Sequence, residues 1–542
     1  MMQTPISPIE VIESFHNLQH QLRDLWQSVE SADNFDPSDA DIVVVPSLSL
    51  DQRELQKIEG FHHYEERLLF SLIRLRNPRT RMVYVTSQPL HPSVIDYYLQ
   101  LLPGIPFSHA RDRLLLLSTY DSSLSPLSQK ILDRPRLMKR IRHAVRPDRS
   151  FMICYNSTAA ERDLSIKTGI PLFALDPALL NWGTKGGSRQ IFAESGVPHP
   201  DGSDSVWSIN ELANAAADLW ERQPQMKRMV VKLNEGFSGE GNALLDLRNI
   251  QEVTPGNASH SARVDALKEQ FACMRFEAKG ETWQNFGSRI SELGAIVELF
   301  LEGEKRSPSV QGRIDPLGEV EIISTHDQIL GGPTGQIYLG CRFPADEAYR
   351  LRLQELGMKI GRNLAEKGAI ERFGVDFVAV HQPNQPGKPE WDIYAIEINL
   401  RKGGTTHPFM TLKFLTNGRY DLSSGLFYSQ QGRAKYYMAT DNLQKDQYRG
   451  LLPNDLMDII ASHQLHFDTG TETGTVFHLM GCLSEFGKLG LTSIGNSPQQ
   501  AEEIYNKLVR AMDEETRPLR SLPSSTFPSG ASGSSMSWSG RY

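Results

Sequence analysis

Residues 230–241 read Val230-Val231-Lys232-Leu233-Asn234-Glu235-Gly236-Phe237-Ser238-Gly239-Glu240-Gly241. The β-branched residues at the start of this stretch predict a buried strand that ends at Lys232. Glycines let backbone N–H groups approach phosphate oxygens closely, and successive amides form anion-binding nests. The spacing matches neither of the two commonest phosphate-binding motifs. On its own, the stretch therefore also fits a Gly-rich hairpin turn after a core strand.

A second stretch, Ala395-Ile396-Glu397-Ile398-Asn399-Leu400-Arg401, reads as a strand with two different faces. Side chains alternate in a strand, so Glu397, Asn399 and Arg401 share one face and the aliphatic residues share the other. A carboxylate and an amide two residues apart suit an oxygen-seeking cation such as Mg2+. An arginine on the same face offers a fork for phosphate or carboxylate. The alternative is an amphipathic edge strand with a chance pattern, but together the two stretches indicate chemistry on ATP.

The composition is that of a globular protein with several domains. The chain has 542 residues, 39% hydrophobic and 23% charged, and a net charge of −8. That length predicts two to four domains, and the negative charge argues against nucleic-acid partners. No signal peptide or membrane span is evident, and the four cysteines are scattered, so we expect a cytoplasmic protein with free thiols and no membrane partner.

The first part of the chain alternates apolar runs with helical patterns, which predicts a parallel α/β layer. Strands are expected at residues 42–46, 82–86, 114–117 and 151–154, with helices at residues 1–35, 65–75 and 93–102. The basic run Arg134–Arg149 is expected on a further helix. A solvated helical face is preferred for it over a phosphate or nucleic-acid patch.

The character of the sequence changes near Pro177 and again near Leu426, where Tyr and His become more frequent before an expected helix over Pro498–Met512. Ser, Gly and Pro dominate Pro523–Tyr542, which predicts a disordered tail. We therefore expect the following units: an α/β domain over residues 1–180, a catalytic unit over 181–420, a small domain over 421–512 and a tail over 513–542.

Residues 180–412 resemble the catalytic unit of the ATP-grasp family. The matching segments, in that family's order, are Lys185 before Gly196-Val197-Pro198, Lys232 with its Gly-rich stretch, the hinge-like Ile296–Glu304, and the metal strands Phe373–Phe377 and Ile396–Asn399. Across its full length the chain is similar to the pheganomycin-type peptide ligases. The resemblance implies an α/β (α+β) fold class: a pre-ATP-grasp α/β domain, a two-lobed ATP-grasp fold and a small C-terminal domain.

The same resemblance implies ATP and Mg2+ as cofactors and assigns the site residues. The nucleotide would contact Lys185, Lys232, Gly236, Ser238, Gly239, Gly241, Glu298, Leu299, Leu301 and Glu304. Within that set, the hinge residues 298, 299 and 301 would serve adenine, and residue 304 the ribose. The metal would be held by Asp376, Glu397 and Asn399. The catalytic residues would be Arg401 and Lys232.

The function implied is an ATP-dependent ligase that joins a carboxylate to an amine. The substrate carboxylate would attack the γ-phosphate, and an amine would displace phosphate from the resulting acyl phosphate. Closure of the Gly-rich stretch would exclude water from that intermediate. The partners are then ATP, a small-molecule or peptide carboxylate, and an amine acceptor. The resemblance also leaves room for a homodimer, because many grasp enzymes pair through their outer domains.

Other interpretations remain at this point. An ATP-grasp kinase would use the same nucleotide residues, and a non-catalytic ATP-binding regulatory protein would keep the Gly-rich stretch but tolerate loss of the metal ligands. The stretch after Arg401 has no acidic residue, which departs from the biotin-dependent carboxylases. We expect the cysteines and His326, His407 and His478 to be structural. Weak substrate-contact candidates are Arg313, Asp327, Gln328 and Arg342.

Overall fold

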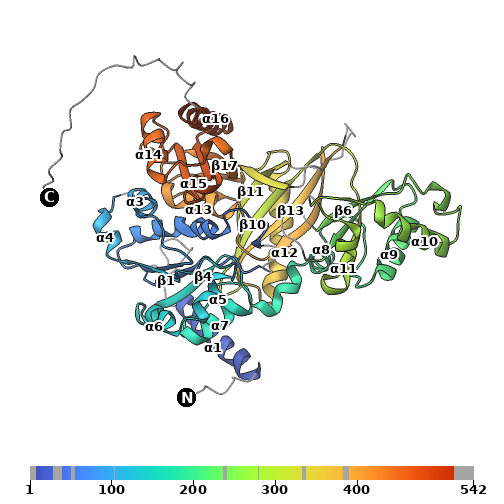
Figure 1. Ribbon diagram of the computed structural model, residues 1–542, viewed down its shortest axis with the longest axis horizontal. Coiled ribbons are helices and arrows are strands. Elements are labelled where there is room, and N and C mark those ends of the chain that lie inside the picture. The colour runs from blue at the N-terminus through green and yellow to red at the C-terminus, as the bar shows by residue number, and fades with distance from the viewer. Residues whose placement is uncertain are drawn as a thin grey trace, which may run out of the picture.

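The computed structural model of the chain describes residues 8–27, 39–50, 55–102, 104–235, 241–278, 280–331, 337–382 and 390–517. It is elongated, with the N-terminal α/β unit at one end, a small lobe at the other and a large sheet between them (Figure 1). None of the helices in these ranges is long and apolar enough to cross a bilayer.

The N-terminal unit is a parallel four-stranded sheet in the order β3-β2-β1-β4, as the alternating pattern predicts. Its strands are β1 (Asp41–Val45), β2 (Arg81–Thr86), β3 (Leu114–Ser118) and β4 (Ser150–Cys154). The helices around it are α1 (Pro8–Gln27), η1 (Phe61–Arg76), α3 (Pro92–Gln100), α4 (Phe107–Arg111), α5 (Leu127–Leu132), α6 (Pro135–His143), η2 (Pro147–Arg149) and α7 (Ala159–Thr168). Apolar clusters fill both faces of the sheet, because strands covered on both sides bury nearly every residue.

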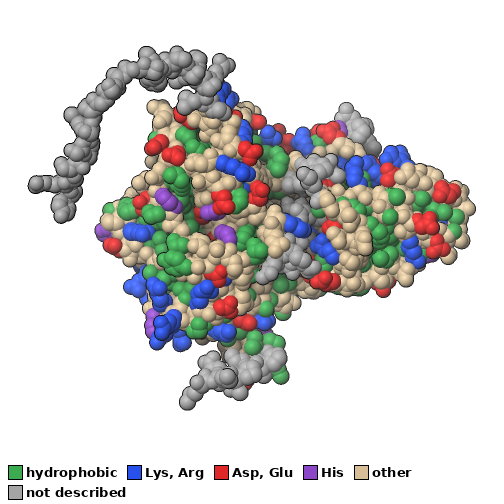
Figure 2. Space-filling view, viewed as in Figure 1, with side chains coloured by type: hydrophobic (Ala, Val, Ile, Leu, Met, Phe, Trp, Pro, Cys, Tyr) green, Lys and Arg blue, Asp and Glu red, His purple; other side chains and the backbone are tan. Residues whose placement is uncertain are grey.

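The basic run forms the short helix α6. Leu137 and Ile141 are buried on its inner face, whereas Arg136, Lys139 and Arg140 are exposed. Lys and Arg side chains gather in the lower left of the space-filling view, where Figure 1 places α6 (Figure 2). The run is a solvent-exposed helical face, as predicted.

The small lobe is a second four-stranded sheet in the order β7-β6-β5-β8, all antiparallel. Its strands are β5 (Arg228–Leu233), β6 (Asn242–Asp246), β7 (Arg275–Phe276) and β8 (Ala295–Leu299). The helices of this lobe are α9 (Ile209–Arg222), α10 (His260–Gln270) and α11 (Trp283–Leu293), with short turns η4 (Gln251–Val253) and η5 (Phe271–Cys273). The lobe has its own apolar core, centred on Trp220 and Phe271.

The central sheet has eleven strands, and its main path is β14-β13-β10-β11-β12-β17-β16-β15. The strands are β9 (Lys305–Arg306), β10 (Pro308–Ile314), β11 (Val320–Gly331), β12 (Ile337–Phe343), β13 (Glu371–His381), β14 (Trp391–Asn399), β15 (Arg419–Asp421), β16 (Leu426–Tyr428), β17 (Ala434–Gln444), β18 (Gly474–His478) and β19 (Lys488–Gly495). The associated helices are η3 (Pro177–Gly183), α8 (Lys185–Glu194), α12 (Arg350–Glu366), α13 (Thr406–Thr416), η6 (Asp446–Tyr448), α14 (Pro453–Ser462), α15 (Cys482–Phe486) and α16 (Pro498–Glu515).

The C-terminal strands belong to this central sheet. β17 pairs with β12 and with β19, and β18 pairs with β19. One apolar cluster runs from Leu22 in α1 to Met512 in α16 and joins the two ends of the chain. The two chain ends thus share a core on one side of the central sheet, and the small lobe stands apart on the other (Figure 1).

Candidate active site

The metal residues proposed from the sequence meet on β13 and β14. Asp376 lies opposite Glu397 in the strand register, and Gly374 lies opposite Asn399. The Asn399 amide donates to Asp376 Oδ2 over 2.9 Å. The two strands therefore place one amide and two carboxylates side by side, as the alternation of residues along the strand requires.

The electrostatics of this group suit a divalent cation. Burial and the neighbouring Glu397 carboxylate raise the pKa of Asp376 to about 6, and a hydrogen bond from Gln328 Nε2 to Oδ1 (2.6 Å) opposes the shift. Facing carboxylates repel each other unless a cation lies between them. The oxygen-only donor set of Asp376, Glu397 and Asn399 fits Mg2+.

Lys185 stands at the first position of α8, and its ammonium lies 2.5 Å from Glu397 Oε1. The helix begins there because Thr184 caps it by accepting from the Gly187 N–H. The next residues must be small: a Cβ at Gly187 would lie 1.9 Å from the carbonyl oxygen of Asn181. Lys185 and the N-terminus of a helix together favour an anion at this point.

Lys232 is the second-last residue of β5, and its side chain reaches Glu298 on the neighbouring strand β8. Its ammonium lies 2.5 Å from Glu298 Oε2, and Arg189 from α8 reaches Oε1 of the same carboxylate at 2.8 Å. Burial acts to raise the pKa of Glu298, but the two cations prevail and lower it. Only 2% of Glu298 is exposed, so its side chain holds Lys232 and α8 in place, and its backbone pairs with Val230 on one side and bridges to Gly202 on the other.

The remaining hinge residues lie at the end of β8 and just after it, where the chain passes from the small lobe to the central sheet. The Leu299 N–H donates to the Asp201 carbonyl at 2.8 Å, and the Leu301 carbonyl accepts from Lys305 Nζ at 2.9 Å. Glu304 is exposed, with Oε2 at 4.0 Å from His381 Nδ1. This crossing is the place where the resemblance puts adenine and ribose.

Part of the Gly-rich stretch lies outside the described residues, including Gly236, Ser238 and Gly239. Gly241 is described: its carbonyl accepts from the Leu233 N–H at 2.9 Å, which closes the hairpin between β5 and β6. Asn234, at the start of the stretch, accepts from the Gly186 N–H at 2.8 Å through its side chain. The stretch is thereby tied to the N-terminus of α8.

Arg401 follows β14 and lines a cavity of about 770 Å3. Lys185, Glu397 and Asn399 line the same wall. Other lining residues come from the N-terminal unit, where Ser49, Leu50 and Asn156–Thr158 follow the carboxyl ends of β1 and β4. The small lobe contributes Glu281, just before α11, and Asn285, Ser288, Arg289 and Glu292 on α11. Ligands of open α/β sheets bind at the carboxyl ends of the strands, so all three units contribute to one chamber.

Several of these residues were not identified from the sequence. Arg189, Asn234 and the cavity residues Asn156–Thr158 carry no local pattern of their own, although Asn234 lies inside the stretch that was singled out. Of the weak candidates, Gln328 contacts Asp376. The others are engaged elsewhere: Asp327 accepts from Tyr349, Arg342 pairs with Glu502 of α16, and Arg313 is buried against Phe173.

Comparisons with known proteins show the family of the chain. An ATP-grasp domain model described as IQCH-like matches residues 178–266 and 257–423, and a model described as the PGM1 C-terminal domain matches residues 455–508. The L-propargylglycine–L-glutamate ligase of Streptantibioticus cattleyicolor is 30% identical over 88% of this chain and 94% of its own. IQ motif-containing protein H of Danio rerio is 22% identical over 73% of this chain, which spans 40% of that protein.

Solved structures with a similar fold include the biotin carboxylase–ATP complex of Campylobacter jejuni, with a TM-score of 0.50 and 13% identity over 85% of this chain and 89% of that one. The biotin carboxylase domain of the Hydrogenobacter thermophilus 2-oxoglutarate carboxylase also has a TM-score of 0.50, at 12% identity over 87% of this chain and 89% of that one. These two likenesses concern the fold. The full-length relative, the two domain models and the arrangement of β13, β14 and α8 lead to one conclusion: the chain belongs to the ATP-grasp carboxylate–amine ligases, among the pheganomycin-type peptide ligases.

Proposed function

We propose that this ligase joins the carboxylate of one amino acid or short peptide to the amine of another, with ATP converted to ADP and phosphate. The observation that supports this proposal best is the wall formed by Lys185, Glu397, Asn399 and Arg401, which faces the carboxyl edge of the N-terminal sheet across one cavity. The cations and metal-binding oxygens of this wall suit a phosphate chain. The cavity beside them has room for an organic substrate.

In the proposed mechanism, Lys185 and Lys232 hold the α- and β-phosphates. Phosphoryl transfer depends mainly on positioning and on neutralising charge. The ammonium of Lys185 and the N-terminus of α8 would both position the phosphates and neutralise their charge at one end of the cavity. Arg401 orients the substrate carboxylate for attack and then holds the acyl phosphate, with a fork that binds two oxygens.

Mg2+ fits the donor set of Asp376, Glu397 and Asn399, which we propose as its ligands. When bound, it supplies Lewis-acid stabilisation of phosphate charge. Lys185 Nζ, now 2.5 Å from Glu397, would then turn from that carboxylate toward phosphate oxygens. The amine substrate would enter from the side of Ser49 and Asn156–Thr158, where the cavity is lined by hydroxyl and amide groups.

The test is a product assay with ATP, Mg2+ and pairs of amino acids, including the pairing named for the Streptantibioticus relative. We expect ADP and inorganic phosphate in equal amounts for each amide bond formed. Hydroxylamine in place of the amine should give a hydroxamate, which reports the acyl phosphate. AMP and pyrophosphate would overturn the mechanism. ADP without phosphate release, together with a phosphate ester, would identify a kinase instead.

A matched pair of variants on β14 tests the metal assignment. Glu397→Gln removes a proposed metal charge at nearly constant volume, and we expect turnover to be lost while the fold persists. Asp392→Asn removes a carboxylate from the same strand, where Asp392 accepts from Gln382 at 2.7 Å away from the site, and it should leave activity and Mg2+ dependence unchanged. Near-normal turnover of Glu397→Gln at low Mg2+ would show that the metal lies elsewhere.

A further inference from the structure

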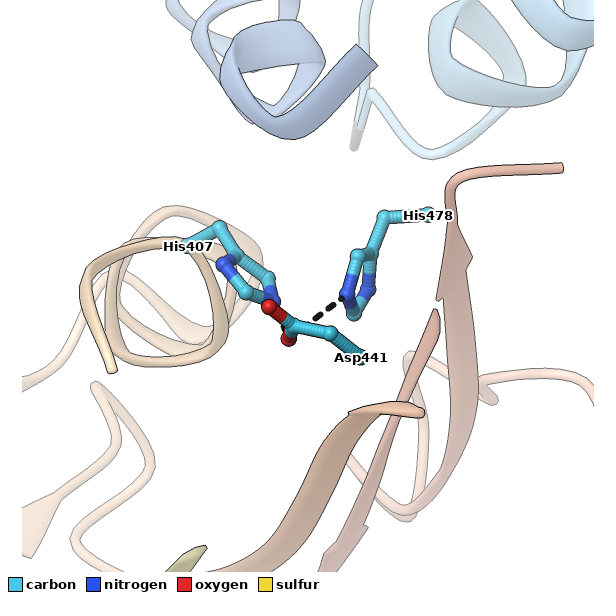
Figure 3. A group of neighbouring side chains, drawn as sticks. All are labelled: His407, Asp441 and His478. Carbon is cyan, nitrogen blue, oxygen red and sulfur yellow. Dashed lines mark hydrogen bonds and ion pairs between the residues drawn. The ribbon is translucent and has the colours of Figure 1, made fainter. Parts of the chain in front are cut away.

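A second polar cluster is buried outside the cavity. It consists of His407, Asp441 and His478, each at most 4% exposed. The three come from different elements: His407 from the first turn of α13, Asp441 from β17 and His478 from the end of β18. Their side chains point toward one another (Figure 3). The ligase mechanism uses none of them.

The distances within this cluster are unusual for hydrogen bonds. Nε2 of His407 and Nε2 of His478 both lie 3.4 Å from Asp441 Oδ1. The His478 contact is a hydrogen bond, but a longer one than the usual length of about 2.7–3.2 Å. The His407 Nε2 atom is buried with no hydrogen-bond partner among the described residues. A tetrahedral zinc ion with bonds of about 2.0–2.1 Å separates its ligand atoms by about 3.3–3.4 Å. The two imidazole-to-carboxylate separations match those between ligand atoms around a shared ion, and all three ligand atoms lie within 4.8 Å of one another.

We propose that His407, Asp441 and His478 form a binding site for a divalent transition-metal ion of the zinc class. Two imidazoles and one carboxylate are a common ligand set for such ions and a poor one for Mg2+. Three protein ligands leave a fourth position for water or another ligand. This inference is independent of the proposed substrates.

The backbone around the cluster is shaped to bring these atoms together. The register of β17 against β19 is irregular between Thr440 and Leu443, so Asp441 lies in a bulge, and bulges redirect side chains. Opposite His478 stands Gly490, where a Cβ would lie 2.1 Å from His478 Nε2. Leu479, the next residue after His478, has a φ of 55°, a strained conformation of the kind that accompanies functional sites.

The surrounding charges leave the ligands available. Arg67 pairs with Asp441 through the other oxygen, Oδ2, and donates to the Tyr155 hydroxyl at 2.8 Å. A ligating carboxylate is typically held in this way by a group behind it. The carboxylate of Glu66 accepts from the N–H of Gly481 at 3.1 Å, three residues after His478.

Such an ion would join parts of the chain that are distant in sequence. α13 begins shortly after Arg401, and the Lys402 N–H between them donates to the Tyr155 carbonyl at 3.1 Å. Fixing His407 to Asp441 and His478 would therefore fix the segment that leaves the active site. The ion would thus position this segment, with water as its fourth ligand.

The test uses the full-length protein, stripped with a chelator, exposed to Zn2+ in excess Mg2+ and desalted before elemental analysis. Excess Mg2+ keeps zinc from the carboxylates of β13 and β14. We expect one zinc per chain in the wild type and a loss of that zinc in His407→Gln and His478→Gln. The matched control is His260→Gln. His260 forms a second, more exposed cluster with Asp218 and Glu221, so the His260→Gln protein should retain the zinc.

Cobalt gives a second readout that does not depend on the variants folding. Co2+ added to the stripped wild type should produce the intense visible absorption of a low-coordinate nitrogen and oxygen site, and Zn2+ should abolish it. Wild-type protein that retains no zinc and shows no such absorption would overturn the proposal. So would a zinc content that His407→Gln and His478→Gln leave unchanged.

Discussion

At the scale of single residues, Glu298 is the buried charge on which the nucleotide side of the site depends. Lys232 and Arg189 meet on its two oxygens. Removal of one partner from a buried ion pair costs about 3–5 kcal/mol, because it leaves the other charge unpaired. A substitution of Lys232 therefore has two consequences, one for ATP and one for the fold, and they can be separated.

Lys232→Met should lower ATP affinity at least about tenfold, because a charge-assisted hydrogen bond contributes about 1.5–3 kcal/mol. It should also lower the free energy of unfolding, since Glu298 loses a partner. The double variant Lys232→Met/Glu298→Gln should be less stable still, because Arg189 then also loses its carboxylate partner, whereas its ATP affinity should match that of the single variant. Calorimetry and urea unfolding measure the two effects, and an unchanged ATP affinity in the single variant would place Lys232 outside the site.

The alternation of side chains along a strand predicts that Glu397 and Asn399 share a face, and the resemblance to the ATP-grasp family adds Asp376; the structure places the three side by side. The sequence does not predict that Gln328 contacts Asp376 or that Arg189 contacts Glu298. Gln328 meets Asp376 from β11, and Arg189 meets Glu298 from α8. Those contacts depend on how separate elements pack, and no local pattern records them. The roles of all these residues in binding and catalysis remain predictions.

At the scale of elements, η1 shows where local patterns fail. Its sequence predicts a helix over residues 65–75, and the structure has a 3-10 helix over Phe61–Arg76. Long 3-10 helices are uncommon in isolation, and this one is buried over most of its length. The packing of η1 between the N-terminal sheet and α13 decides its form.

Among the groups that η1 buries is Glu65, which accepts from both the N–H and the hydroxyl of Ser87 at 2.6 Å. Burial raises the pKa of Glu65 to about 7. Between its unfolded pKa, near 4.5, and about 7, the folded state holds a proton that the unfolded state has lost. The contribution of Glu65 to the free energy of unfolding is therefore full at low pH, and it is lost as the pH rises to about 7. Urea unfolding across that range should show a smaller decline in the free energy of unfolding for Glu65→Gln, and an unchanged decline for an exposed control, Glu252→Gln. An unchanged slope in Glu65→Gln would contradict this account.

The start of α8 gives a second prediction for an element. Gly187→Ala would place a Cβ 1.9 Å from the Asn181 carbonyl oxygen, so α8 must shift, at a cost of about 1–3 kcal/mol. ATP affinity should fall with stability, because Lys185 moves with the helix. Gly403→Ala is the matched control, since a Cβ there meets nothing within 4 Å. Equal thermal stability of the two variants would show that α8 accommodates the extra carbon without moving.

At the scale of the whole molecule, the two ends of the chain are bound together. Apolar residues from α1 and η1 share one cluster with residues of α13, α14 and α16. The sequence predicts a small C-terminal region from its change in composition. It does not reveal that β17–β19 extend the central sheet, because strand pairing between β12 and β17 depends on residues about a hundred positions apart.

Two truncations test this arrangement. Removing residues 421–542 should give insoluble protein, because it exposes the edge of β12 and the apolar faces of η1 and α13. Removing only the residues after Pro523, which lie outside the described residues, should leave activity unchanged, because Ser, Gly and Pro cannot build a core. Solubility, circular dichroism and turnover report the outcome. A soluble, active protein ending at residue 420 would contradict the shared core.

The cluster that reaches from Leu22 to Met512 also sets the order of events during synthesis. Domains generally fold as they emerge from the ribosome, the N-terminal ones first. Here the N-terminal sheet leaves the exit tunnel long before α14 and α16 are synthesised. Until then, the apolar residues of η1 and α3 that share a cluster with these helices stay uncovered. The nascent chain must carry exposed apolar surface until translation is nearly complete. Chaperones that hold nascent chains should therefore limit the yield of this ligase more than its final stability does.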